Sequence, residues 1–186
     1  MAATETTDLP LGFKAPDFSL PNATVEGMVR AKDVFVGRPT VVVFMCNHCP
    51  FVIHLLESFV AFAADCKPRG VDVVAISSND VVNYPQDGFG YMQALAQRQG
   101  FTFPYLYDES QEVARAYDAA CTPDFSVYDQ DSKCVYRGQY DGSRPGNDID
   151  VSGDDLRRVV NTLLAGEDVP EAGQMPSLGC NIKWKG

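Results

Sequence analysis

The 186-residue sequence predicts an α/β fold in which helices flank a central mixed β-sheet, with an N-terminal β-hairpin and an inserted helix. Residues 41–45 form an unbroken apolar run, which is typical of a strand buried on both faces. A helical pattern of apolar residues follows directly, and a second apolar run occupies residues 71–77. A strand, a helix and a strand in this order predict a parallel unit with a right-handed crossover.

The hairpin is predicted to precede the central strand. Residues 15–20 indicate a short strand that ends at Pro21, and residues 25–36 form its return and a turn. After the central strand, apolar side chains recur at helical spacing until the break at residues 67–70. These side chains are Val52, Leu55, Leu56, Phe59, Val60 and Ala63.

The second half of the chain continues this alternation of helices and strands. Its predicted elements are a loop at residues 79–89, a helix at 91–99, a strand at 103–107, a helix at 109–117, a hairpin of strands at 125–128 and 135–137, a loop at 141–153 and a helix from Ser152 to Gly166. Pro104 predicts that its strand lies at a sheet edge, and Asp108 is the expected N-cap of the following helix.

The chain is expected to hold one domain. We predict a flexible tail at residues 1–10, the domain itself at residues 11–166 and a C-terminal extension at residues 167–186. The sequence shows no internal repeat and no linker that would divide the central part.

The composition limits the partners and the compartment. A formal net charge of −10 argues against nucleic acid and anionic membrane surfaces as partners. No apolar run approaches the roughly 20 residues of a membrane-spanning helix, and residues 1–8 lack the regions of a signal peptide. Six cysteines are too few for a disulfide scaffold in this chain. We therefore expect a cytoplasmic protein, or an organellar one if a targeting segment has been removed.

The sequence Cys46-Asn47-His48-Cys49 lies where the buried strand meets the helix. Unpaired N–H groups and the helix dipole favour a thiolate at such a place. Two cysteines three positions apart can also bond to each other, so one can attack a disulfide and the other can resolve the product. The motif therefore predicts a redox dithiol, which must be within reach of its substrate.

A metal site is the alternative interpretation of this motif. Zinc normally needs a second pair of ligands at similar spacing, and the other four cysteines are solitary. We therefore predict no metal and no cofactor. A non-catalytic module that holds a metal through Cys46, Cys49 and His48 stays as an alternative.

Several segments together resemble one family. They are Ala15-Pro-Asp-Phe-Ser-Leu20, the strand into Cys46-Asn-His-Cys49, Phe103-Pro-Tyr-Leu-Tyr-Asp108, Thr122-Pro123 and Phe125-Ser-Val-Tyr-Asp129. With the order of elements, they resemble the thioredoxin-like superfamily, in its alkyl hydroperoxide reductase/thiol-specific antioxidant (peroxiredoxin-like, redoxin) branch, over about residues 10–166. The Cys-Asn-His-Cys-Pro motif and the tail at residues 179–184 resemble an uncharacterised group within it.

The resemblance implies a thioredoxin-like fold and a thiol–disulfide oxidoreductase. Cys46 resembles the attacking thiol, and Cys49 the resolving one. Pro123 resembles the cis-proline opposite the dithiol, where the backbone of Thr122 would pair with a substrate strand. The implied partners are a disulfide-containing protein or small thiol substrate and a reducing thiol. The oligomeric state is not indicated.

Residues between and around the cysteines are expected to tune the dithiol. The imidazole of His48, next to Asn47, is expected to lower the pKa of Cys46 and to make the couple more oxidising. Two further thiols, Cys121 and Cys180, are candidate redox partners of the pair; the alternative is that each is a packed structural residue.

Two departures from the family pattern concern the mechanism. Thr40 replaces the buried acid that thioredoxins have six positions before the first cysteine. Val43 stands where peroxiredoxins have a Thr or Ser that binds peroxide. Peroxiredoxin-like peroxidase activity is therefore kept as an alternative to disulfide exchange.

Overall fold

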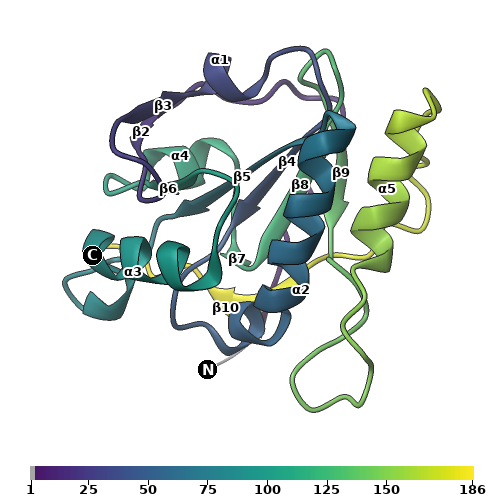
Figure 1. The fold of residues 1–186 in the computed structure, drawn as a ribbon. Helices are drawn as coiled ribbons and strands as arrows, with labels where there is room; N and C mark the ends of the chain where they lie inside the picture. The colour runs from purple at the N-terminus through teal and green to yellow at the C-terminus, as the bar shows by residue number, and fades with distance from the viewer. Residues whose placement is uncertain (1–2) are drawn as a thin grey trace.

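A computed structural model describes residues 3–186 of the chain (Figure 1). Its centre is a five-stranded sheet with the order β6-β5-β4-β8-β9. These strands are β6 (Tyr105–Tyr107), β5 (Asp72–Ser77), β4 (Thr40–Phe44), β8 (Asp124–Tyr128) and β9 (Cys134–Gly138). β4 is parallel to β5, which is parallel to β6, whereas β8 is antiparallel to both β4 and β9. The predicted mixed α/β architecture is confirmed.

The central strand β4 is buried on both faces, as its unbroken apolar run predicts. Val41 and Val43 point into one hydrophobic core, while Val42 and Phe44 point into the other. Helix α2 (Pro50–Cys66) follows β4 and packs on the first core. Pro50 is well suited to the first helical position, because that N–H has no partner within the helix.

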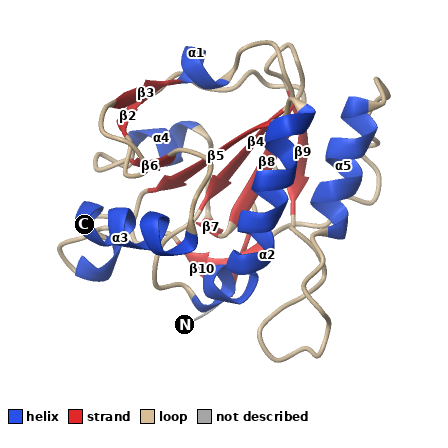
Figure 2. Ribbon diagram, viewed as in Figure 1, coloured by secondary structure: helices blue, strands red, loops and turns tan. Residues whose placement is uncertain are grey.

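Helices cover both faces of the sheet (Figure 2). The face with α2 also carries α3 (Phe89–Gln99) and α5 (Asp154–Leu164), whose apolar residues join the same core. The other face carries α1 (Ala31–Val34) and α4 (Glu112–Ala116). Two short 3-10 helices and a hairpin complete the fold: η1 (Lys67–Arg69), η2 (Pro85–Asp87), β2 (Ser19–Pro21) and β3 (Met28–Arg30). No described helix has the length and apolar character required to cross a membrane.

A second, antiparallel sheet joins the two ends of the chain to the domain. Its order is β1 (Ala3–Glu5), β10 (Leu178–Asn181) and β7 (Cys121–Thr122). The predicted flexible tail at residues 1–10 is therefore wrong for residues 3–5; residues 1–2 lie outside the described part. The predicted extension at 167–186 likewise returns to the domain. In both segments a short strand is stabilised by a distant partner, which local sequence patterns do not reveal.

The helix predicted after Asp108 begins later than expected. It starts at Glu112, because Gln111 adopts a left-handed conformation with φ of 65°. The Asp108 carboxylate nevertheless accepts hydrogen bonds from the N–H groups of Val113 and Ala114. The strand predicted at 103–107 is reduced to β6 at the sheet edge, as Pro104 predicts.

Candidate active site

The Cys46–Cys49 motif connects the end of β4 to the start of α2. Cys49 is the N-cap residue of the helix. Both side chains are almost completely buried, with 1% of Cys46 and none of Cys49 exposed. The expectation that the dithiol is within reach of a substrate is therefore not met by this conformation. All six cysteines of the chain are free thiols.

Three thiols converge on Thr122, which is joined to Pro123 by a cis peptide bond. The Sγ of Cys46 lies 3.6 Å from the Thr122 hydroxyl, and the Cys49 thiol donates to the Thr122 carbonyl oxygen at 3.0 Å. Cys180 is the residue directly opposite Thr122 in the β7–β10 pairing. Cys180 thus belongs to the site and not to a loose tail.

The neighbouring Cys121 faces away from this cluster. Its Sγ contacts the carbonyl oxygen of Pro123 at 3.6 Å, and its residue pairs with Asn181 across the strands. Burial, chiefly, raises the pKa of the Cys121 thiol. The arrangement is that of a packed structural residue.

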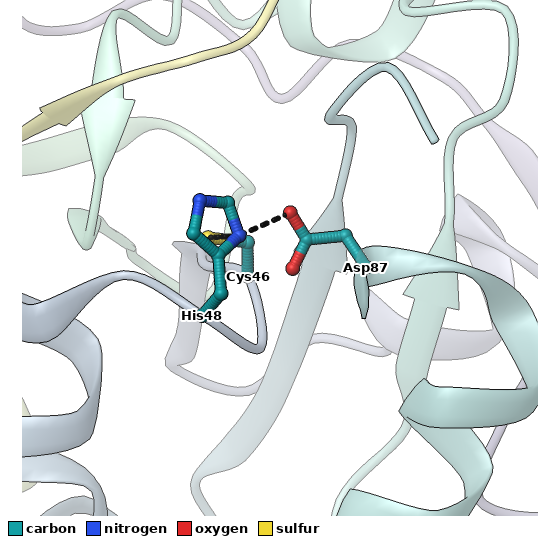
Figure 3. Close-up of side chains that lie close together, drawn as sticks. All are labelled: Cys46, His48 and Asp87. Carbon is teal, nitrogen blue, oxygen red and sulfur yellow. Dashed lines mark hydrogen bonds and ion pairs between the residues drawn. The ribbon is translucent and has the colours of Figure 1, made fainter. Parts of the chain in front are cut away.

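A buried carboxylate that the sequence analysis does not single out anchors the motif. Asp87, at the end of η2, has no exposed surface. It accepts hydrogen bonds from the backbone N–H of Asn47 at 2.8 Å and from the side-chain amide of Asn79 at 2.8 Å. The Nδ1 of His48 lies 2.7 Å from Oδ2 of the same carboxylate (Figure 3). These contacts fix the backbone between the two cysteines.

One signal could have pointed to Asp87. The Cys46 motif follows β4, and the loop that carries Asp87 follows the parallel strand β5. The carboxyl ends of neighbouring parallel strands meet at one edge of the sheet, where sites are commonly built. An acid in that loop was therefore a candidate neighbour of the dithiol.

The position of His48 changes its expected role. Its Nδ1 is 3.8 Å from the Sγ of Cys46 but only 2.7 Å from Asp87, so the ring hydrogen is directed at the carboxylate. The hydrogen bond with Cys49, burial and the charge of Asp87 together raise the pKa of the Cys46 thiol. The direction is opposite to the lowered pKa predicted for Cys46, chiefly because its thiol donates to Cys49 and is buried, and further because Asp87 disfavours a second negative charge nearby.

The pKa of Cys49 moves in the opposite direction. A hydrogen bond from Cys46 lowers it most, and the Thr122 hydroxyl and the N–H of Val52 lower it further. The Thr122 carbonyl opposes this effect, because it accepts a hydrogen bond only from the protonated thiol. Burial also opposes it, whereas Cys180 is a fourth donor to the Cys49 sulfur. On balance, the four donors lower the pKa of Cys49, so the first negative charge of the pair forms on Cys49.

Asn47 holds the loop without entering the sulfur cluster. Its side-chain oxygen accepts a hydrogen bond from the Tyr105 hydroxyl at 2.9 Å, and its amide donates to the carbonyl of Gln86 at 2.9 Å. Tyr105 is fully buried, and burial raises its pKa well above the ordinary value, so it stays a donor. Asn47 thus connects the motif to β6 and to η2.

Cys46, His48 and Asp87 are also a candidate metal cluster, since their ligand atoms lie within 4.8 Å of one another (Figure 3). Two ligands of a tetrahedral zinc ion are about 3.3 Å apart. The 2.7 Å between His48 Nδ1 and Asp87 is instead a hydrogen-bond distance. The Asp87 carboxylate also accepts hydrogen bonds from Asn47 and Asn79. These residues do not fit a metal ion in their present arrangement.

Solved structures of two other proteins are similar over the whole chain. An uncharacterised conserved protein from Geobacillus kaustophilus is 53% identical, with a TM-score of 0.97 over 100% of this chain and 97% of that one. A hypothetical protein from Sinorhizobium meliloti 1021 is 44% identical, with a TM-score of 0.94 over 98% of both chains. A thiol:disulfide interchange protein, DsbE, from Chlorobium tepidum shares the fold at 23% identity, with a TM-score of 0.66 over 84% of this chain and 99% of that one.

Comparison with curated proteins gave no match. Residues 11–137, well over half of the chain, match the AhpC/TSA family. The thioredoxin-like fold of the neighbours and the buried dithiol agree with that match. The chain therefore belongs to the AhpC/TSA family of thioredoxin-fold thiol redox proteins.

Proposed function

We propose that this protein is a thiol–disulfide oxidoreductase in which Cys46 attacks and Cys49 resolves. The observation that carries this proposal is the convergence of both thiols on Thr122 at the junction of β4 and α2. Cys46 is the better candidate for the attack because its neighbour His48 is partly exposed, whereas Cys49 lies at the base of the helix beneath β10.

The reaction uses the hydrogen bond between the two thiols. When the pair loses its first proton, the negative charge forms on Cys49, and the charge moves to Cys46 when the Cys46 proton passes to Cys49 along that bond. The Cys46 thiolate attacks one sulfur of a disulfide, and the other sulfur leaves as a thiolate. Cys49 then attacks Cys46, releases the second thiol and leaves a Cys46–Cys49 disulfide. A reducing thiol partner restores the dithiol, and no step needs a cofactor.

Cys180 is proposed as an additional redox thiol. It lies opposite Thr122, and its hydrogen bond with Cys49 adds to burial in raising the pKa of Cys180 to about 11. It would exchange with the Cys46–Cys49 disulfide to give a Cys49–Cys180 disulfide and a free Cys46, with no net change in oxidation. Cys121 takes no part, because its thiol faces the Pro123 carbonyl.

A second candidate function is peroxide reduction. The Thr122 hydroxyl, 3.6 Å from Cys46, supplies from β7 the hydroxyl that Val43 cannot supply from β4. Peroxide would oxidise Cys46 to a sulfenic acid and release water, and Cys49 would condense with it to the same disulfide and a second water. Consumption of hydrogen peroxide that requires Cys46 and a thiol reductant would favour this function.

Trapping a mixed disulfide tests the proposed function. The Cys49→Ser variant is incubated with a small aromatic disulfide, and intact mass is then measured. We expect one stable adduct on Cys46 in this variant and none in Cys46→Ser, while the wild type proceeds to an internal disulfide. The matched control is Cys134→Ser, which alters a buried thiol remote from the motif and should behave as wild type. Absence of a Cys46 adduct at every pH would refute the proposed roles.

A further inference from the structure

The C-terminal strap, residues 178–185, covers the dithiol. Its strand β10 lies between β1 and β7, so both of its edges are paired. On the β7 side, Cys180 pairs with Thr122 and Asn181 pairs with Cys121. The backbone of Thr122, which the family resemblance assigns to an extended substrate, is therefore occupied by the chain itself.

The strap is seated closely on the loop of the cis-proline. A Cβ added to Gly179 would collide with the backbone carbonyl of Thr122 and would also approach the nitrogen of Pro123. The backbone of Gly179 is not in the left-handed region, so the close approach, and not the conformation, requires glycine here. No further polypeptide fits between the strap and this loop.

Beyond β10, the strap is fastened at its far end. Its contacts are the Ile182 N–H to the Ala120 carbonyl, the Lys183 N–H to the Asn79 side chain, the Lys183 carbonyl to Asp80 N and Gln111 Nε2, the Lys185 N–H to Gln111 Oε1, and the Arg115 guanidinium over the Trp184 ring. Asn79 also holds Asp87, so the strap and the Cys46 motif share one hydrogen-bonded network. Opening the strap would break all of these contacts at once.

Access to Cys46 is less restricted from the side of its own loop. His48 lies 3.8 Å from the Cys46 sulfur, and 19% of its side chain is exposed. The imidazole stacks on Tyr84, with ring centroids 5.5 Å apart and planes inclined by 11°. His48 is the partly exposed side chain beside the sulfur, so a small molecule would approach Cys46 by displacing the imidazole, whereas a polypeptide strand on Thr122 would require removal of the strap.

We propose that the dithiol acts on low-molecular-weight disulfides and that the strap excludes extended polypeptide disulfides. The proposal rests on the proposed function and names its substrate class. One small disulfide accepts two electrons and leaves as two thiols, while Cys46 and Cys49 lose two protons and form a disulfide. The path past His48 determines the size of the substrate.

Comparison of two disulfides tests the proposal in the full-length protein. The reduced wild type is given 2-hydroxyethyl disulfide or insulin, with dithiothreitol as the reductant and the rate without protein subtracted. A strap that is open in about 1% of molecules lowers the rate with insulin about 100-fold. Equal rates with both substrates would overturn the proposal. Turnover of neither substrate would instead overturn the proposed function itself.

Two variants should loosen the strap by different means. Gly179→Ala forces β10 off Thr122, and Gln111→Asn keeps the left-handed conformation but shortens the side chain that holds Lys183 and Lys185. We expect the rate of insulin reduction by each variant to rise about 10-fold or more, because the open state of the strap becomes about 10 times more populated. The rate with 2-hydroxyethyl disulfide should stay near that of the wild type.

Gly142→Ala is the matched control, because the nearest atom to its added Cβ is 4.0 Å away, and it should leave both rates unchanged. Thermal unfolding shows whether each variant is folded. If Gly179→Ala does not fold, Gln111→Asn decides the question alone. A folded, loosened variant that still discriminates against insulin as strongly as the wild type would overturn the proposal.

Discussion

Replacing the Asp87 carboxylate by an amide tests the anchor of the motif. Asp87→Asn keeps one oxygen for the Asn47 N–H but places an NH₂ group opposite two donors, His48 and Asn79. His48 is partly exposed and can change its tautomer. Asn79 cannot simply rotate its amide, because its oxygen accepts the N–H of Lys183. One buried donor is left without a partner in either orientation.

The expected loss of stability follows from that count. A buried polar group without its partner costs about 1–3 kcal/mol, and the lost bond was to a charged group, so we expect about 2–3 kcal/mol. For a domain of this size, that loss lowers the melting temperature by about 4–12 °C. The same substitution removes a negative charge near Cys46, so the pKa of that thiol should fall. Unfolding would also bring the pKa of Cys46 down to its ordinary value, so the titration is made under conditions in which the variant is folded.

Two measurements check this prediction. Urea denaturation gives the free energy of unfolding, and alkylation of the Cys46 peptide by iodoacetamide, followed by mass spectrometry between pH 6 and pH 10 or so, gives the thiol titration. Asp80→Asn is the control, because the Asp80 carboxylate lies in the same loop but accepts its hydrogen bonds from Val82 and Asn83 and not from the Cys46 motif. If Asp87→Asn matches Asp80→Asn in the Cys46 titration, the electrostatic argument is wrong.

Three further predictions concern the other thiols and His48. Burial raises the pKa of Cys66 to about 11, whereas an unfolded cysteine titrates near 8.5, so the contribution of Cys66 to the free energy of unfolding should be constant below about pH 8.5 and fall as pH rises toward 11; urea stability profiles of the wild type and Cys66→Ala that run parallel up to pH 10 would contradict it. Disulfide mapping after oxidation should find Cys49 linked to Cys46 and to Cys180 in the wild type, but only to Cys46 in Cys180→Ser; identical disulfide patterns in the two proteins would exclude a redox role for Cys180. His48→Pro removes the donor that shields the Asp87 carboxylate, so the thiolate form is disfavoured and the couple becomes more reducing; a potential equal to that of the wild type would refute this.

The parts of the fold that the sequence predicts are those coded by neighbours in the chain. The apolar run of β4, the periodic face of α2 and the break after it are each visible within a short window. Pro104 and the polar loop between β8 and β9 mark an edge and a hairpin by local rules. These elements alone bring the dithiol to the strand–helix junction.

The missed parts of the site depend on contacts between distant segments. β1 and β10 are strands only because they pair with each other and with β7. Gly179 looks like an ordinary turn glycine in the sequence, yet it is required by the carbonyl of a residue far away in the chain. Asp87 is one of several acids in a polar loop until the fold places it beside Asn47. No local pattern distinguishes these residues.

Thr40 stands where thioredoxins have an acid, but a carboxylate from another element, Asp87, still influences the dithiol. Thr40 is buried at the opposite end of β4 from the motif, where its hydroxyl donates to the carbonyl of Arg38. Asp87 approaches from the loop after β5 and meets the sulfur cluster through His48. The same nitrogen, Nδ1 of His48, lies near both the carboxylate and the sulfur, so Asp87 acts on Cys46 through its charge and through the position of the imidazole, and not through a proton relay. The acid that influences the dithiol therefore lies on the side of Cys46 that carries the partly exposed His48, which is also the side of the proposed entry of a small substrate.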